Sequence, residues 1–205
     1  MAESKTTYIQ SYCRIQNNEI ILNGDSVFKL EPTTFSDFSK KAIQKFEISY
    51  PKFFKMDNLS KLAFLGAELL LKSELDAATE NNTALIFSNK SSSLDTDVKH
   101  QNSISDKENY YPSPAVFVYT LPNICLGEIS IRHQLKSENS FFIFADFNPK
   151  FMEKYSTILL ETNKADKVLC GWVEYFNEEY KAFLYVVGTQ GELDHNQELL
   201  KQLYN

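Results

Sequence analysis

Cysteine and histidine, the side chains that most often act as nucleophiles, bases or metal ligands, are few in this chain and far apart. The cysteines are Cys13, Cys125 and Cys170, and the histidines are His100, His133 and His195. No two cysteines have the spacing of a zinc or redox motif, and no local spacing joins a histidine to a cysteine or to a serine and an acid. We expect Cys125 and Cys170 to be inert core residues, and the histidines to lie at the surface.

Asp95-Thr96-Asp97 resembles a fragment of a loop that binds a hard cation. It lacks the glycine and the bidentate glutamate of a calcium loop, so we interpret the two carboxylates as solvated loop residues. The residue types alone therefore indicate no metal and no other cofactor.

The composition is that of an acidic, aromatic-rich globular protein. The chain has 205 residues, a formal net charge of −6 and 14% aromatic residues. The aromatic content argues against disorder of the whole chain, and the acidic balance disfavours nucleic acid, because phosphate binding needs a basic face. No apolar stretch has transmembrane length, and the N-terminal residues lack the apolar core of a secretory signal. With three widely spaced cysteines, these features make a reducing cytoplasm the expected location, without membrane contact.

Apolar residues at three-and-four spacing predict the helices. Thr34 is placed to cap a helix over 34–46, and the pattern is strongest over 57–73. In that second helix the small residues Ala63, Gly66 and Ala67 would allow a close neighbour. Further helices are expected over 122–135, 149–162 and 192–204.

Short apolar or alternating runs predict the strands, and the polar stretch 89–114 predicts the longest loop, which we expect to be mobile or to contact a partner. The predicted strands cover 7–15, 18–22, 83–88, 115–120, 140–145, 167–175 and 180–188. The last two are expected to form a hairpin through residues 177–179. Strands alternating with helices predict an α/β fold with a mixed sheet of about five strands, covered by helices on both faces.

Several segments, taken in order, resemble the N-terminal half of a β-ketoacyl synthase of the thiolase-like superfamily. Two segments resemble sequence motifs of that family: Lys55-Met56-Asp57 before an apolar helix, and the SSSLDTD loop at 91–97. The family resemblance continues in two later segments. One is Leu121-Pro122-Asn123 with Gly127-Glu128-Ile129, and the other is Ala165-Asp166 followed by Cys170-Gly171-Trp172-Val173-Glu174. The resemblance covers roughly 45–188 and implies a single thiolase-like half-fold over 1–205, with a C-terminal tail at 189–205.

The resemblance also identifies a departure at the position of the family's acyl-accepting cysteine. An alignment without a gap from Asn139 to Ala165-Asp166 places Asp146 there, and no cysteine lies between 126 and 169. An ionised carboxylate is a poor acyl acceptor, so the family's acyl transfer looks lost. The second-half catalytic residues of a full synthase, which is about twice this length, have no counterpart in the chain.

The helix that follows this position is buried between two halves in the full family fold. Here the predicted helix 149–162 has one polar face, which suits a half that exists alone. The strand with Phe141, Phe142 and Phe144 would then lie at a sheet edge that invites pairing. We expect it to be covered in a homodimer or by a larger ketosynthase.

Three functions remain open from the sequence. The first is a non-catalytic ketosynthase-like accessory protein of a fatty-acid-like, polyene or polyketide pathway, which pairs with itself, with a true ketosynthase or with an acyl carrier protein. Such carriers are acidic, and Lys52, Lys55 and Lys61 are the cluster offered for docking, although a solvated face explains them as well. The second is an acyl-thioester-processing enzyme that uses Asp146 as a base. The third is an unrelated α/β module.

Overall fold

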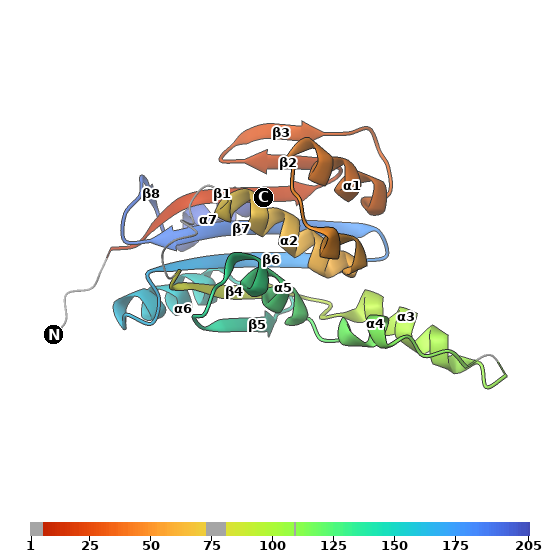
Figure 1. Cartoon of the computed structure of the whole chain (residues 1–205). Coiled ribbons are helices and arrows are strands. Elements are labelled where there is room, and N and C mark those ends of the chain that lie inside the picture. Colours follow the sequence, from red (N-terminus) through yellow and green to blue (C-terminus); the bar gives the residue numbers. More distant parts are fainter. Residues whose placement is uncertain (1–5, 73–80, 109) are drawn as a thin grey trace.

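A computed structural model describes residues 6–72, 81–108 and 110–205 (Figure 1). Its centre is one mixed sheet of eight strands, in the order β3-β2-β1-β7-β6-β4-β5, with β8 beside β1. The strands are β1 (Tyr8–Gln16), β2 (Glu19–Leu22), β3 (Asp25–Lys29), β4 (Thr83–Asn89), β5 (Asn139–Ile143), β6 (Lys167–Phe176), β7 (Glu179–Gly188) and β8 (Leu193–Asp194). The sheet is therefore wider than the five strands expected, because the N-terminal hairpins extend it beyond β7.

The order of the strands follows from two kinds of connection. β4 runs parallel to both β5 and β6, and the crossovers between them carry helices. The remaining long pairs, β6 with β7 and β7 with β1, are antiparallel. The β6–β7 turn is Asn177-Glu178, and both residues have positive φ, as a tight two-residue hairpin requires. The predicted hairpin is confirmed.

Helices cover both faces of the sheet, as expected for this class. The helices are α1 (Phe35–Lys45), the 3-10 helix η1 (Pro51–Lys55), α2 (Asn58–Leu71), α3 (Leu94–Ser105), α4 (Pro114–Val118), α5 (Ile124–His133), α6 (Pro149–Glu161) and α7 (Gln197–Tyr204). Because side chains alternate along a strand, Leu85 and Phe87 of β4 face the core under α1, α2 and α5, whereas Ala84 and Ile86 face the core under α6 and α7. This arrangement explains why β4 is apolar without alternation.

The small residues of α2 allow a neighbouring strand to pack closely, as expected. Gly66 lies against β7, where a Cβ atom would come within 2.7 Å of Leu184 Cδ1. Asp57 caps α2 by accepting a hydrogen bond from the Ser60 backbone N–H at 2.9 Å. The α2 helix is thus fixed closely over the middle of the sheet.

Two predictions for the middle of the chain are wrong. Residues 115–120 do not form a strand: Pro114 begins α4, and the Ser113 side chain accepts the Val116 N–H at 3.4 Å. Part of the expected loop 89–114 is the helix α3, whose one fully buried residue is Thr96. Short apolar runs do not distinguish a strand from a helix, and a mostly exposed helix has little periodicity to detect. Together α3 and α4 form an arm that projects beyond the ends of β4 and β6 (Figure 1).

Candidate functional site

Asp146 lies in the turn between β5 and α6, in the strand–turn–helix order that the alignment predicted. It is exposed and lines an open cavity of about 410 Å³. The cap of α6 is not Asp146 but Asn148, whose Oδ1 accepts the Phe151 N–H at 3.0 Å. Asp146 therefore precedes the helix and receives no hydrogen bond from its first turn among the bonds the described residues form.

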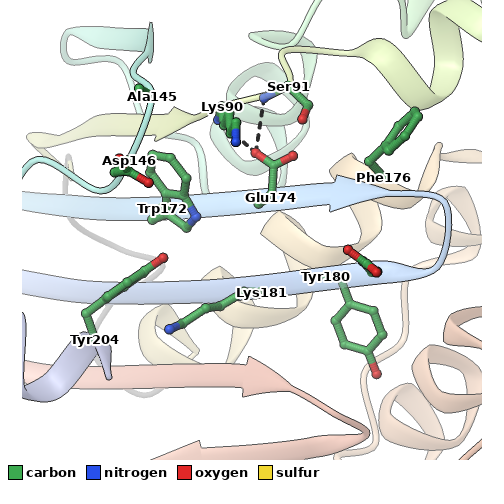
Figure 2. A pocket seen from close by; sticks show the side chains of 11 residues that line it. Lys90, Ser91, Ala145, Asp146, Trp172, Glu174, Phe176, Tyr180, Lys181 and Tyr204 are labelled. Carbon is green, nitrogen blue, oxygen red and sulfur yellow. Dashed lines mark hydrogen bonds between the residues drawn. The ribbon is translucent and has the colours of Figure 1, made fainter.

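The walls of this cavity come from the β6–β7 hairpin and from the C-terminal helix, besides the turns after β4 and β5 (Figure 2). Trp172 and Glu174 project from β6, Lys181 from β7 and Tyr204 from α7. The Lys181 ammonium lies 3.6 Å from the centre of the Tyr204 ring, a cation–π contact. Burial, with Arg14 nearby, lowers the pKa of Lys181. Aromatic side chains, Trp172 and Tyr204, thus form part of the cavity wall, and Lys181 is positioned by its contact with the Tyr204 ring.

Glu174 braces the loop that leaves β4. One of its oxygens accepts the backbone N–H of Lys90 at 2.7 Å and that of Ser91 at 3.1 Å (Figure 2). Burial raises the pKa of Tyr204, and the carboxylates of Asp146 and Glu174 act in the same direction. Glu174 therefore acts as a structural anchor.

The cavity brings neither a cysteine nor a histidine to Asp146. Its lining contains neither cysteine nor histidine. The three thiols are buried elsewhere: burial raises the pKa of Cys13 and of Cys170 to about 12, and that of Cys125 well above its ordinary value. Cys125 and Cys170 are core residues, as expected, and the structure adds Cys13 to them. Within the described ranges, no group of three or more histidine, cysteine, aspartate or glutamate side chains is arranged to hold a metal ion.

Of the histidines expected at the surface, His195 is buried and His133 is partly buried in an ion pair. His195 packs beside Tyr185, and its Nδ1 lies 3.1 Å from Thr7 Oγ1. His133 Nε2 lies 3.1 Å from Glu68 Oε2. Both predictions failed because the partners lie far along the chain, where local spacing carries no signal. His100 is half-buried, with its ring 5.3 Å from that of Phe117.

The segment Asp95-Thr96-Asp97, interpreted from the sequence as a solvated loop, forms structural hydrogen bonds. Thr96 donates a hydrogen bond to the half-buried Asp57 at 2.8 Å, and Asp95 accepts the Asn177 backbone N–H at 3.2 Å. Ser93 Oγ donates to the Thr120 carbonyl at 2.7 Å. These bonds fix the base of the α3–α4 arm to α2 and to the β6–β7 turn.

The three lysines proposed for docking lie on η1 and α2. Lys52 pairs with the buried Glu128 at 2.8 Å, and Lys55 is exposed. Lys61 is half-buried, and its pKa is lowered by burial and by the neighbouring charges of Lys40 and Lys99, against the pull of Asp57. The structure therefore brings Lys40 and Lys99, which the sequence did not single out, towards Lys61.

The aromatic strand lies at the sheet edge, where it was expected. β5 pairs with β4 alone, and the Phe144 N–H still donates to the Asn89 carbonyl, at 2.9 Å. The phenylalanine rings are not themselves exposed: Phe142 and Phe144 pack on Phe151 of α6, with centroids 4.7 and 5.0 Å apart. What remains open is the backbone edge of β5, together with Ile143, which is 50% exposed.

Several large apolar side chains of the arm and of the segment after it are exposed, and sequence reasoning did not single them out. They are Leu94, Val98, Tyr110, Tyr111, Phe117, Val118 and Leu121. Exposed apolar side chains of this kind favour contact with another molecule. The sequence signal was the apolar run at 115–120, which was interpreted as a strand.

Comparison with known proteins identifies the fold as that of the ketosynthases. A structure described as the ishigamide ketosynthase/chain length factor matches 89% of this chain and 62% of that chain, with a TM-score of 0.67 and 15% identity. A ketosynthase (ApeO) in complex with its chain length factor (ApeC) from Xenorhabdus doucetiae matches with a TM-score of 0.59 and 12% identity. That match covers 97% of this chain and 90% of the other, so the two chains have similar lengths.

A third structure is described as AntDE:AntF, a type II PKS acyl-carrier protein in complex with its ketosynthase. It matches with a TM-score of 0.64 and 14% identity over 97% of this chain and 65% of that one. This chain thus spans about two thirds of the length of the first and third structures. No family profile and no curated protein matches the sequence. The chain has the ketosynthase-like thiolase fold that its motifs resemble.

None of the described helices is both long and apolar enough to cross a membrane.

Proposed function

We propose that this chain is a non-catalytic ketosynthase-like subunit, which pairs along β5 with a second ketosynthase-like chain in a fatty-acid-like, polyene or polyketide pathway. The observation that carries the proposal is the backbone edge of β5, which the described strands leave open, together with the exposed apolar residue Ile143. An uncovered edge with apolar neighbours is a liability in a protein that stays alone, and a second strand removes it.

The proposal that the chain is non-catalytic depends on the surroundings of Asp146. A ketosynthase-like acyl transfer needs a thiolate at this position, and the thiols here are buried in the two cores. No histidine lines the cavity to assist a different nucleophile. Asp146 is therefore proposed to be a surface residue of the subunit.

The nature of the partner is supported by the structures with the same fold. Two of them are described as a ketosynthase with a chain length factor, and one matched chain is close to this chain in length. A ketosynthase is therefore the proposed second chain. A homodimer is the alternative, because an edge strand can also pair antiparallel with its own copy.

The test compares two single substitutions of exposed apolar residues. In a parallel pair, N–H groups alternate between the two sides of a strand, so the Phe144 bond to β4 places the Ile143 N–H on the open side. Ile143→Lys would place a charge on that edge. Leu193→Lys, on β8 at 38% exposure, is the matched control.

The measurement is the mass of the complex by light scattering, after mixing with a ketosynthase from the same organism. We expect a complex with one copy of each chain for the unaltered protein and for Leu193→Lys, and its loss for Ile143→Lys. A complex that forms equally well with Ile143→Lys would reject pairing along β5. A mass of twice this chain in the absence of the ketosynthase would favour the homodimer.

An acyl carrier protein is proposed as a further partner of the assembly. The third similar structure is described as a ketosynthase with an acyl-carrier protein, and Lys55 offers an exposed positive charge. The test is a titration of the assembled pair with acyl carrier protein, in which Lys55→Glu should weaken binding. Equal affinity for both proteins would remove Lys55 from the interface.

A further inference from the structure

Lys181 on β7 brings an amine into the wall of the cavity beside Asp146. The register of the β6–β7 hairpin places Glu174 directly opposite Lys181. One oxygen of Glu174 instead accepts the backbone N–H groups of Lys90 and Ser91, at 2.7 and 3.1 Å. Among the residues that the structure describes, no carboxylate forms an ion pair with Lys181. The described carboxylates therefore leave its amine unpaired.

An aromatic ring of the C-terminal helix holds this amine in place. The Lys181 Nζ lies 3.6 Å from the centre of the Tyr204 ring, and Figure 2 shows the ammonium end of the side chain directed towards Tyr204. The Tyr204 ring stacks on Phe147 with centroids 4.7 Å apart, and it meets Trp172 edge-on at 6.4 Å. The position of the amine is therefore fixed against a wall of packed rings.

A second cation lies on the neighbouring strand. Arg14 of β1 pairs in register with Phe183, two residues from Lys181 on the same face of β7. The Arg14 Nη1 donates to the Leu203 carbonyl at 3.4 Å, which ties the end of α7 to β1. Burial lowers the pKa of Lys181, and the charge of Arg14 acts in the same direction. A lysine that is desolvated and close to another cation is activated as a nucleophile. The other charged residues of the cavity lining are Lys90, Asp146, Glu174 and Glu179.

The space around the amine combines access to solvent with apolar surface. The cavity is open, so water and small solutes reach Lys181. Four aromatic side chains contribute to its lining: Trp172, Phe176, Tyr180 and Tyr204. Aromatic surface of this kind favours the burial of an apolar chain. The arrangement suits a molecule that has a group reactive towards amines at one end and an apolar chain at the other.

We infer that Lys181 is a covalent binding site for aldehydes and ketones with an apolar chain, which it captures as an imine. The neutral amine adds to the carbonyl carbon: a C–N bond forms, the nitrogen loses a proton to water, and the carbonyl oxygen gains one from water. The resulting hydroxyl group takes up a second proton and leaves as water, while the nitrogen loses its remaining proton and the C=N bond forms. No oxidant or reductant is needed, and water reverses the reaction. The inference goes beyond the proposed subunit role, because it requires no second chain.

The probe is hexanal, and acetaldehyde is the short-chain comparison. Sodium cyanoborohydride, present during a brief reaction of the full chain near neutral pH, reduces each imine to a stable secondary amine. Cleavage after glutamate then gives peptides 180–192, 20–31 and 139–153, in which the lysines are Lys181, Lys29 and Lys150, one in each. Mass spectrometry of these peptides measures the labelled fraction at each site. Lys29 and Lys150 are the controls, and both are exposed.

Two results are expected from the unaltered protein. Hexanal should label Lys181 at least about fivefold faster than it labels Lys29 and Lys150, because the amine of Lys181 is activated by its surroundings. The ratio of hexanal to acetaldehyde labelling should be at least about fivefold higher at Lys181 than at the controls, because the additional CH2 groups would be buried against the aromatic wall. Accessibility alone would give the opposite order, since both controls are more exposed than Lys181.

A substitution locates the apolar chain in the cavity. Tyr204→Ala removes one wall and should lower the preference of Lys181 for hexanal over acetaldehyde by at least about threefold. Tyr111→Ala, which removes an exposed ring on the arm, is the matched control and should leave that preference unchanged. Circular dichroism checks that both variants fold. The inference would be overturned by labelling of Lys181 no faster than that of the controls, by one chain-length preference at all three lysines, or by a preference that Tyr204→Ala leaves unchanged.

Discussion

Asp146 occupies the position at which the family resemblance places a nucleophile, in a cavity whose other charged lining residues are Lys90, Glu174, Glu179 and Lys181. The lining of the cavity contains neither cysteine nor histidine, which supports the proposal that Asp146 does not take part in acyl transfer.

The first prediction concerns this residue. Asp146→Asn should leave the free energy of unfolding within about 0.5 kcal/mol of the original, because the side chain is exposed. Hydrolysis of an acyl thioester should be equally absent from both proteins, as measured by thiol release. Turnover that disappears in Asp146→Asn would support the alternative of a reshaped enzyme.

A second prediction concerns the ion pair between α2 and α5. Glu68 is 1% exposed, and its carboxylate accepts from Arg132 Nη2 at 2.6 Å and from Nε at 3.1 Å. Arg132→Ala leaves that charge buried without its main partner and should lower the free energy of unfolding by about 3 kcal/mol. Unfolding in urea measures this change in the free energy of unfolding. Lys29→Ala, which breaks the exposed pair with Glu19, is the control and should cost under about 1 kcal/mol.

The same pair determines part of the acid sensitivity. Burial opposes ionisation of Glu68, but His133 and Arg132 outweigh it and lower the pKa of the carboxyl from 4.5 to about 2. A lowered folded-state pKa gives stability that is present above pH 4.5 and is lost as the pH falls towards 2. Arg132→Ala should flatten this part of the stability profile. An unchanged profile would show that the pair does not control it.

A third prediction concerns His195. Burial lowers the pKa of its imidazole from 6.5 to about 4, so the folded protein holds the neutral ring. The unfolded chain takes up the proton first, and stability is therefore lost as the pH falls from 6.5 towards 4. His195→Gln should weaken this dependence, as measured by thermal unfolding across that range. His100→Gln, whose ring is only half-buried, is the control.

At the scale of elements, local patterns predicted much of the fold. The helix over 57–73, its small residues and the hairpin through 177–179 were found because their signals are periodic and local. The arm was missed because α3 is mostly exposed and α4 is short and apolar. The position of Asp146 came from the family resemblance, whereas its cavity depends on β6, β7 and α7, which no local pattern joins to it.

The fourth prediction compares two helical glycines. Gly66→Ala would place a Cβ 2.7 Å from Leu184 Cδ1 in the core and should destabilise the protein by about 1–3 kcal/mol. Gly127→Ala on α5 meets nothing within 4 Å and should stabilise it by about 0.5–1 kcal/mol. Opposite shifts in the urea midpoint are expected. Equal shifts would contradict the close packing of α2 on β7.

At the scale of the whole molecule, the two ends of the sheet differ in character. The β5 end presents an open backbone edge and apolar side chains, whereas the α1–η1 end is rich in lysine. The proposed ketosynthase and the proposed acyl carrier protein would therefore contact different surfaces of this chain.

The pairing of β1 with β7 has a consequence for how the chain reaches its structure. Tyr8 lies opposite Gly188, so the strand made first pairs with the last long strand. Strand pairs of such sequence separation form slowly, because the entropy cost of closing the long loop comes before the stabilising contacts between the strands form. During synthesis, the apolar faces of β4 and β6 would stay exposed until β7 has been made and the sheet has formed. In this period a chaperone would protect the nascent protein from aggregation.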